Sequence, residues 1–167
     1  TWKSRGLGDV YKRQINIKIV KISSKISSII LNEPKTYNSL SFKNLIDLLK
    51  ALKKLDADNK VKVIIIEGAG KGFSAGHNLK EVRGLKKRDK YQKLFNLCSK
   101  VMLQIVEGRK PVIAKVHGAA FAAGFQLVAS CDLAYSTKDA LFATPGVNIG
   151  LFCSTPMVCL LYTSDAA

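Results

Sequence analysis

The chain has 167 residues, enough for one domain with a hydrophobic core, and its 47% hydrophobic content excludes wholesale disorder. Its longest apolar runs are strand-sized, well short of the roughly 18 residues that a membrane-spanning helix needs. The net charge of +15 suits an anionic partner such as a nucleotide, a nucleic acid or a membrane surface, but lysines spread along the whole chain also fit a generally basic surface.

Both ends of the chain differ from the rest. Residues 1–14 show no helical or strand period, residues 159–167 are similarly out of character, and both resemble translated adapter sequence. We do not expect them to form part of the fold. The sequence then predicts a partial domain over residues 15–158, whose native start, with any targeting peptide, and native C-terminus are missing.

The first predicted elements are two strands and a helix. Residues 15–22 alternate polar and apolar side chains, and residues 25–31 read as the partner strand across a Ser-rich turn. A loop over 32–38 is broken by Pro34, and Ser41 is a plausible N-cap for the next helix. The helix keeps an apolar stripe of Leu45, Leu48, Leu49, Leu52 and Leu55, with Lys50, Lys53 and Lys54 largely off it.

Alternating strands and helices continue to residue 150. Residues 61–68 and 111–118 are apolar strands that we expect to be buried on both faces. Between them lie a Gly-rich turn, a short and very basic helix or loop (79–90), and an amphipathic helix marked by Tyr91, Leu94, Phe95, Cys98, Val101, Met102, Ile105 and Val106. A helix (122–130), a strand (131–136) and an extended loop (141–150) follow. This order predicts an α/β architecture.

The cysteine and histidine content argues against disulfides and metal sites. The four cysteines form no Cys-x-x-Cys pair, and only two histidines are present. A His-rich metal site is therefore excluded, and we expect unpaired thiols in a reducing compartment and no bound metal.

Two turns rich in glycine and alanine are the main candidates for a functional site. "KGFSAGHNL" (71–79) follows one buried strand, and "HGAAFAAGFQL" (117–127) follows the other. Neighbouring parallel strands would bring both turns to the same sheet edge, where α/β proteins bind ligands. Small residues allow close approach of the backbone to a ligand. Two backbone N–H groups converging on one oxygen would form an oxyanion hole.

Two other functions are compatible with parts of the sequence. "GFSAG" (72–76) fits the G-x-S-x-G elbow of serine hydrolases, with Ser74 as nucleophile. The catalytic triad also needs a later acidic residue and then a histidine, and the one distant downstream histidine, His117, already lies in a glycine turn of its own. Lys43, Lys50, Lys53 and Lys54 on the first helix could face the phosphates of RNA, although the aromatic residues of a stacking platform are absent. We weigh both as remote alternatives, so nucleic acid is an unlikely partner.

Three segments, in order, resemble the crotonase (enoyl-CoA hydratase/isomerase) family. They are "LNEPKTYNSLS", "GAGKGFSAGHNLKE" and "PVIAKVHGAAFAAGFQLVASCDLAYS", and the likeness extends over about residues 15–157. "FSAGHNLKE" and "FATPGVNIGLFCSTP" resemble one subgroup of that family. The resemblance implies the ClpP/crotonase-like α/β fold, a spiral of ββα units in two roughly perpendicular sheets ringed by helices. The family's C-terminal helical part would be missing from this chain.

The resemblance also implies a set of site residues. The family's hole holds the thioester oxygen of an acyl-CoA, and its donors match the backbone N–H groups of His77 and Ala123. The family's two catalytic glutamates match Gln126 and Gly146, so ordinary hydration is in doubt because neither can exchange a proton. Further ligand contacts are expected at Lys35, Tyr37, Asn38, Ser74, Ala75 and Leu79, with Lys35 and the basic stretch 83–90 near the CoA phosphates. Weaker polar candidates are Thr144, Asn148 and Ser154, whereas Asp132 reads as structural.

The implied function is acyl-CoA binding in fatty acid or other acyl-CoA metabolism. The family favours an enzyme of lyase or isomerase type, but the missing glutamates leave open a non-catalytic acyl-CoA binder or assembly partner. No cofactor is implied beyond the CoA thioester as substrate or ligand. The family further implies homotrimers or hexamers of the full-length protein, without a membrane span. Its location would be the cytoplasm of a bacterium or the mitochondrial matrix of a eukaryote.

Overall fold

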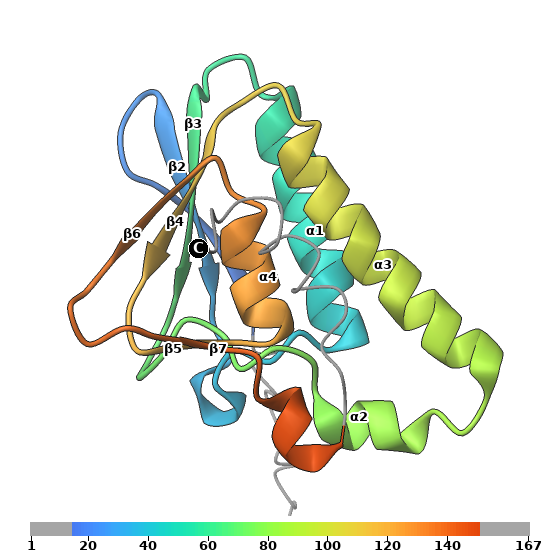
Figure 1. The fold of residues 1–167 in the computed structure, drawn as a ribbon. Helices are drawn as coiled ribbons and strands as arrows, with labels where there is room; N and C mark the ends of the chain where they lie inside the picture. The colour runs from blue at the N-terminus through green and yellow to red at the C-terminus, as the bar shows by residue number, and fades with distance from the viewer. Residues whose placement is uncertain (1–14, 151–167) are drawn as a thin grey trace, which may run out of the picture.

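The computed structural model describes residues 15–150, and these form a five-stranded sheet with helices on one face (Figure 1). The strand order is β1-β2-β3-β4-β6. The bounds are β1 (Ile17–Lys21), β2 (Ile26–Leu31), β3 (Val63–Gly68), β4 (Val112–Val116) and β6 (Leu133–Ser136). β1 pairs antiparallel with β2, and all other neighbours are parallel. The predicted α/β architecture is confirmed.

The helices pack from one side. Their bounds are η1 (Pro34–Thr36), α1 (Phe42–Ala57), α2 (Leu79–Gly84), α3 (Arg88–Val106), α4 (Ala123–Ala129) and η2 (Pro145–Ile149). Figure 1 shows α1, α3 and α4 against the same face of the sheet, with α2 and η2 near one end of the strands. Within the described residues, none of the helices combines the length and the apolar character required to cross a membrane.

Helix α1 forms where the sequence predicts it. Ser41 caps it, because its Oγ accepts the Asn44 backbone N–H at 3.2 Å. The leucines of the predicted stripe are buried at Leu45, Leu48, Leu52 and Leu55, and each contributes about 1.5–3 kcal/mol through burial. Leu49 is half-buried at the margin of the stripe.

A second, smaller sheet crosses the end of the first. β5 (Ala119–Phe121) and β7 (Leu141–Ala143) pair in parallel. Single parallel bridges join Ser74 to Ala120 and Leu40 to His77, so the loop after β3 belongs to the same layer. Neither strand is predicted from the sequence, which indicates a turn at residues 119–121 and an extended loop at residues 141–150. Three-residue strands carry too little periodicity to be recognised.

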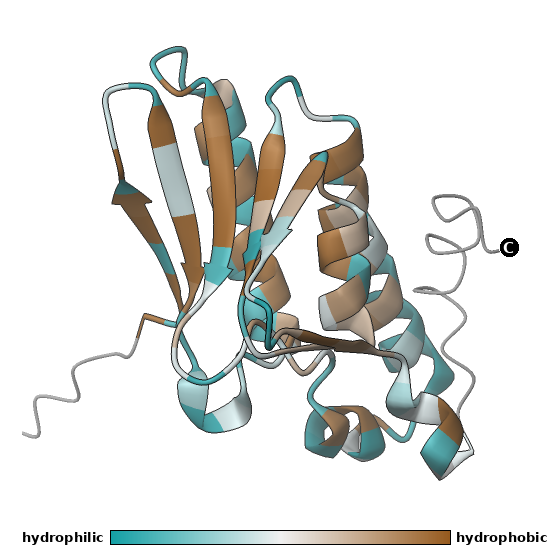
Figure 2. Cartoon of the chain, turned by 60° about the vertical axis from the view of Figure 1, so that its left-hand side comes forward, coloured by the Kyte–Doolittle hydropathy of each residue, from teal (hydrophilic) through white to brown (hydrophobic). Residues whose placement is uncertain are grey.

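The prediction that β3 and β4 are buried on both faces is wrong. Ile64 and Ile66 of β3 face the helices and are 2% and 0% exposed, but Ile65 on the opposite face is only half-buried, and Lys115 of β4 is exposed. No described element covers this opposite face, which lies in front of the helices in Figure 2. Residues on the face opposite the helices are therefore more exposed than the apolar sequence of these strands predicts.

The stripe predicted for α3 also needs correction at two positions. Leu94, Cys98, Val101, Met102 and Ile105 are buried as expected. Phe95 and Val106, in contrast, are exposed, because a helix in contact with one layer buries a single stripe. The excluded ends, residues 1–14 and 159–167, lie outside the described residues.

Candidate functional site

The two glycine-rich turns meet at one end of the main sheet, as predicted. β3 and β4 are adjacent and parallel, with Glu67 opposite Lys115 at the ends that lead into the turns. Backbone hydrogen bonds then join the turns directly: Ser74 N–H donates to the Ala119 carbonyl at 3.1 Å, and Phe121 N–H donates to the Ser74 carbonyl at 2.9 Å. The two segments therefore form one rigid unit.

Glycines make this contact possible. A Cβ on Gly124 would lie 2.3 Å from the Ser74 carbonyl oxygen, and a Cβ on Gly118 would lie 2.2 Å from the Lys71 carbonyl oxygen. Both distances are far shorter than any real contact of a Cβ atom. The small residues that the sequence analysis singled out thus allow one backbone to lie directly on the other.

Gly76 and Ala123 define the closest part of the site. Gly76 has a φ of +84°, and a Cβ there would lie 3.0 Å from the Ala123 nitrogen and 2.8 Å from the Phe121 carbonyl oxygen. No acceptor within residues 15–150 takes the backbone N–H of His77, the next residue, or that of Ala123. Gly76 therefore brings the first turn close to the second at a point where a side chain would collide, with an unused backbone N–H in each turn.

Ala122, which precedes the second donor, has a strained backbone. Its φ of 48° and ψ of −120° are unusual for a residue with a side chain, and such conformations cost about 1–3 kcal/mol. A hydrogen bond of 2.8 Å from its N–H to the Ala143 carbonyl of β7 holds it there. The second sheet thus fixes the turn that aims the Ala123 N–H.

Asn38 organises the first turn from inside the protein. Its Nδ2 lies 2.8, 2.9 and 3.1 Å from the carbonyl oxygens of Ala69, Gly72 and Phe73, and its Oδ1 accepts the Glu33 N–H. Asn38 is 2% exposed and has a φ of 54°. Asn38 is predicted from the sequence as a ligand contact, and its scaffold role is not. The signal was present, because asparagine is the usual non-glycine residue in left-handed backbone.

The side chain of His77 is packed and oriented. Its Nδ1 lies 3.3 Å from the Leu40 carbonyl oxygen, and its ring packs nearly perpendicular to the Phe95 ring, with centroids 5.4 Å apart. Because a carbonyl only accepts, this contact requires the proton on Nδ1 and leaves a lone pair on Nε2. Burial lowers the pKa of the His77 imidazole below its usual value, against the opposing effects of the Leu40 carbonyl and the Glu81 carboxylate.

Gln126 lies on α4, one turn after Ala123. It is 7% exposed, and its Oε1 is buried without a hydrogen-bond partner among residues 15–150. Leaving such an acceptor unpaired costs about 1–3 kcal/mol, so a partner from outside this set of residues is expected. Gly146 is buried in η2, and Asp132 is structural as predicted, because its Oδ2 accepts the Val112 N–H at 2.7 Å.

Comparison with known proteins identifies the fold of this site. The profile of the enoyl-CoA hydratase/isomerase family matches residues 21–162. The chain belongs to the enoyl-CoA hydratase/isomerase family. Human mitochondrial enoyl-CoA hydratase domain-containing protein 3 is 52% identical over 139 residues, which are 81% of this chain and 45% of that protein. A probable peroxisomal enoyl-CoA hydratase of Arabidopsis thaliana is 33% identical over 136 residues, 81% of this chain and 50% of that protein.

Solved structures of the family confirm the crotonase fold. An enoyl-CoA hydratase from Mycobacterium smegmatis superposes with a TM-score of 0.88 at 44% identity, over 91% of this chain and 59% of that one. The structure of the human domain-containing protein 3 gives 0.86 at 44% identity, over 90% and 59%. The chain thus spans about half the length of the curated relatives it matches.

The remaining predicted residues within the described range lie near the first turn or in the 3-10 helix η2 and its N-cap. Lys35, Tyr37, Ala75 and Leu79 are exposed near the first turn, and Thr144 and Asn148 lie at and within η2. Ser154 lies outside the described residues. Their contacts with a ligand remain predictions.

Ser74 is not an exposed nucleophile. It is 0% exposed, its Oγ donates to the Asn38 carbonyl at 3.0 Å, and the same oxygen accepts the Gly76 N–H at 3.2 Å. His117, the histidine of the proposed triad, contacts the Gly70 carbonyl instead. The serine-hydrolase alternative is therefore excluded, because a nucleophile must reach its substrate.

The described residues also contain no group of three His, Cys, Asp or Glu side chains that could hold a metal ion. Cys98 and Cys131 are free thiols within this part of the chain, and burial raises the pKa of each to about 12. Neither thiol has the lowered pKa of a reactive cysteine.

Proposed function

We propose that the protein binds an acyl-CoA and holds its thioester oxygen between the backbone N–H groups of His77 and Ala123. The observation that carries this proposal is the close approach of Gly76 to Ala123. A Cβ added to Gly76 would lie only 3.0 Å from the Ala123 nitrogen. The backbone N–H groups of His77 and Ala123, on the two sides of this contact, have no acceptors in residues 15–150. Such paired donors stabilise negative charge as it develops on a carbonyl oxygen.

Ordinary hydration is not the reaction we expect. Adding water across a double bond requires groups that accept and return a proton, and neither Gln126 nor Gly146 can do so. The unpartnered Oε1 of Gln126 supports a different role, which is to accept a hydrogen bond from a water or from the acyl group. Gln126 would then orient the ligand without titrating. An isomerase or lyase reaction of a fatty acyl-CoA fits the family, with the reacting proton carried by another group.

The second candidate is an acyl-CoA binder without catalytic activity, or an assembly partner of related subunits. The same two residues favour it, because a glutamine and a glycine stand where the family has its acid–base pair. Turnover separates the two candidates. Incubation of the full-length protein with a panel of enoyl-CoA thioesters would yield isomerised or hydrated products only if the protein is an enzyme.

The names of several relatives suggest where the full-length protein works. Enoyl-CoA hydratase domain-containing protein 3 of human, rat and frog is named as mitochondrial. We propose a mitochondrial matrix location in a eukaryote, and a homotrimer or hexamer as the family's usual assembly. Binding of the CoA phosphates by Lys35 and the basic stretch 83–90 is a further part of the proposal. Affinity for CoA that does not change between dilute and physiological salt would disprove that electrostatic part.

A spectroscopic experiment tests the oxyanion hole directly. A cinnamoyl-CoA absorbs at longer wavelength when its thioester oxygen accepts strong hydrogen bonds, so the wild-type protein should shift its spectrum. Ala123→Pro removes one donor at the first position of α4, where helices tolerate proline. The shift should disappear in Ala123→Pro and persist in the control Ala123→Gly, which keeps the N–H. Equal shifts in both variants would refute the proposed hole.

A gain-of-function variant tests the proposal that Gln126 and Gly146 cannot supply the proton transfers of hydration. In the wild type, crotonyl-CoA hydration should be at least about 10²-fold slower than in a hydratase with both glutamates. The double variant Gln126→Glu/Gly146→Glu should raise the rate. Wild-type turnover at the level of such hydratases would refute the interpretation.

A further inference from the structure

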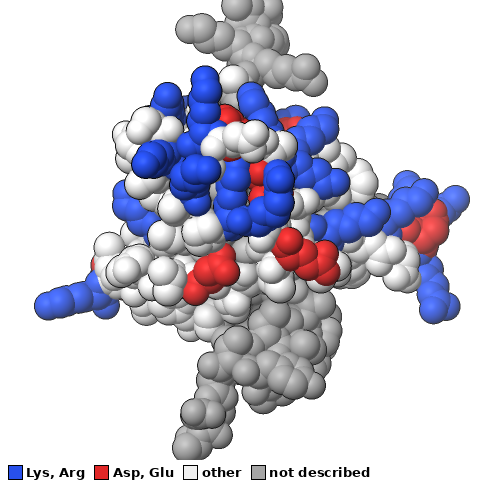
Figure 3. Space-filling model, turned by 90° about the horizontal axis from the view of Figure 1, so that it is seen from above, with Lys and Arg blue, Asp and Glu red and all other residues white. Residues whose placement is uncertain are grey.

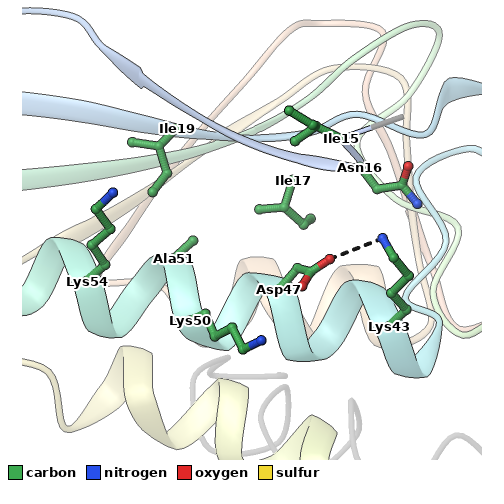
Figure 4. A pocket seen from close by; sticks show the side chains of 9 residues that line it. All are labelled: Ile15, Asn16, Ile17, Ile19, Lys43, Asp47, Lys50, Ala51 and Lys54. Carbon is green, nitrogen blue, oxygen red and sulfur yellow. Dashed lines mark hydrogen bonds and ion pairs between the residues drawn. The ribbon is translucent and has the colours of Figure 1, made fainter. Parts of the chain in front are cut away.

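A groove outside the candidate site runs between β1 and α1 (Figure 4). It encloses about 650 Å³ and is lined by Ile15, Asn16, Ile17, Ile19, Lys43, Asp47, Lys50, Ala51 and Lys54. None of these residues belongs to the acyl-CoA site described above. Figure 4 shows Ile17 and Ile19 pointing from β1 toward α1, with the lysines along the helix.

One wall of the groove is the free edge of the main sheet. β1 is the last strand of the sheet. Two hydrogen bonds show which of its backbone groups face β2: Asn32 N–H donates to the Asn16 carbonyl at 2.6 Å, and Ile22 N–H donates to the Ile26 carbonyl at 2.9 Å. In an antiparallel pair these groups alternate. The N–H and C=O groups of Ile17, Ile19 and Lys21 therefore point away from β2, and no partner within residues 15–150 takes them.

The other wall is a basic stripe of α1. Lys43, Asp47, Lys50 and Lys54 recur at helical spacing. Asp47 is paired with Lys43 at 3.2 Å, whereas Lys50 and Lys54 form no ion pair within the described residues. Their spacing of four residues corresponds to about 6 Å along the helix axis. Two residues of a β-strand span about 6.8 Å, so acidic side chains at alternate strand positions match this pair of lysines.

We propose that the groove binds an extended acidic peptide segment of a partner protein, which adds to β1 as a further strand. Its backbone pairs with the free groups of Ile17, Ile19 and Lys21. Its alternate acidic side chains face Lys50 and Lys54, while their methylene groups lie on Ile17, Ile19 and Ala51. The charge of the walls selects an acidic sequence, and the free edge selects an extended one.

The observations favour this occupant over two others. A second copy of the chain would bring Lys18 and Lys21 of one β1 against those of the other, and like charges opposite each other destabilise paired strands. Figure 3 shows Lys and Arg crowding the surface seen from above, which agrees with the basic character of the chain. RNA would use the lysines but gains little from a floor of isoleucine and alanine, since its bases stack on aromatic rings.

The test uses the full chain and a labelled peptide of about seven residues that alternates glutamate and valine. Fluorescence anisotropy should report binding that weakens about tenfold or more in Lys50→Glu/Lys54→Glu. The control Lys53→Glu/Lys60→Glu has the same net charge but changes lysines outside the groove, and should bind like the wild type. Ile19→Pro, which removes an outward N–H and no bond to β2, should also abolish binding.

Amide exchange locates the peptide. Binding should slow exchange at Ile17, Ile19 and Lys21, and a peptide with glutamine in place of glutamate should fail to do so. Four results would overturn the proposal: no binding, equal loss in both charge variants, binding without protection of the β1 edge, or equal protection by an RNA oligonucleotide. Protection of the edge without peptide would mean that the chain itself or a second copy fills the groove, and would overturn it too.

Discussion

Replacing Gly76 by alanine should disrupt the proposed oxyanion hole. The added Cβ would lie 3.0 Å from the Ala123 nitrogen and 2.8 Å from the Phe121 carbonyl oxygen, so the backbone of one turn must move to accommodate it. This movement would misalign the His77 and Ala123 N–H groups, which are proposed to hold one ligand oxygen together. We therefore expect Gly76→Ala to abolish the spectral shift of bound cinnamoyl-CoA, even where the CoA part still binds.

The same substitution has a cost in stability that can be worked out from the structure. A residue with a side chain in left-handed backbone, here φ +84°, loses about 1–2 kcal/mol relative to glycine. Overpacking against the Phe121 carbonyl adds about 1–3 kcal/mol. The expected loss of about 2–5 kcal/mol is compatible with a folded protein at the stable end of the range for single domains, about 5–15 kcal/mol.

Urea unfolding and the spectral assay should be run together on this variant. Gly84→Ala is the matched control, because no atom lies within 4 Å of a Cβ at that position at the end of α2. It should leave both the spectral shift and the unfolding midpoint close to wild type. If Gly76→Ala keeps the full spectral shift and unfolds within about 1 kcal/mol of wild type, the two turns do not meet as described.

Three further predictions follow from buried groups. Asn38→Ala should lower the free energy of unfolding by about 2–4 kcal/mol, because buried carbonyl groups lose their hydrogen-bond donor. The control Asn59→Ala, at an exposed position, should change it little, and equal effects in urea unfolding would contradict the scaffold role. Burial raises the pKa of Cys98 and of Cys131 to about 12, so both thiols should resist iodoacetamide at pH 8 in the native state. Peptide mass spectrometry would map the labelled sites, and rapid labelling of either cysteine would show an accessible thiolate. Burial lowers the pKa of His77, so an NMR titration should place it below 6.5, and a value at or above 6.5 would contradict this. The folded protein then binds this proton less readily than the unfolded chain does. His77 therefore contributes stability above about pH 6.5, and this stability is lost as the pH falls through the folded pKa.

The meeting of the two glycine-rich turns could be predicted from the sequence because its signals are local. Gly76, Gly118 and Gly124 lie in two short turns, each directly after an apolar strand, and adjacent parallel strands carry such turns to one edge. The N-cap Ser41 and the leucine period of α1 were equally local signals, and both are confirmed. The order of three matching segments gave the family.

Tertiary structure decided what depends on contacts between distant residues. The amide of Asn38 reaches carbonyl groups 31 to 35 residues away, and no local pattern shows whether a polar side chain serves a ligand or its own fold. The three-residue strands β5 and β7 exist because the spiral lays them side by side, and they in turn hold the strained Ala122. The apolar runs of β3 and β4 could not tell one covered face from two, since the hydrophobicity of a strand records its composition and only the packed layers determine what lies against it.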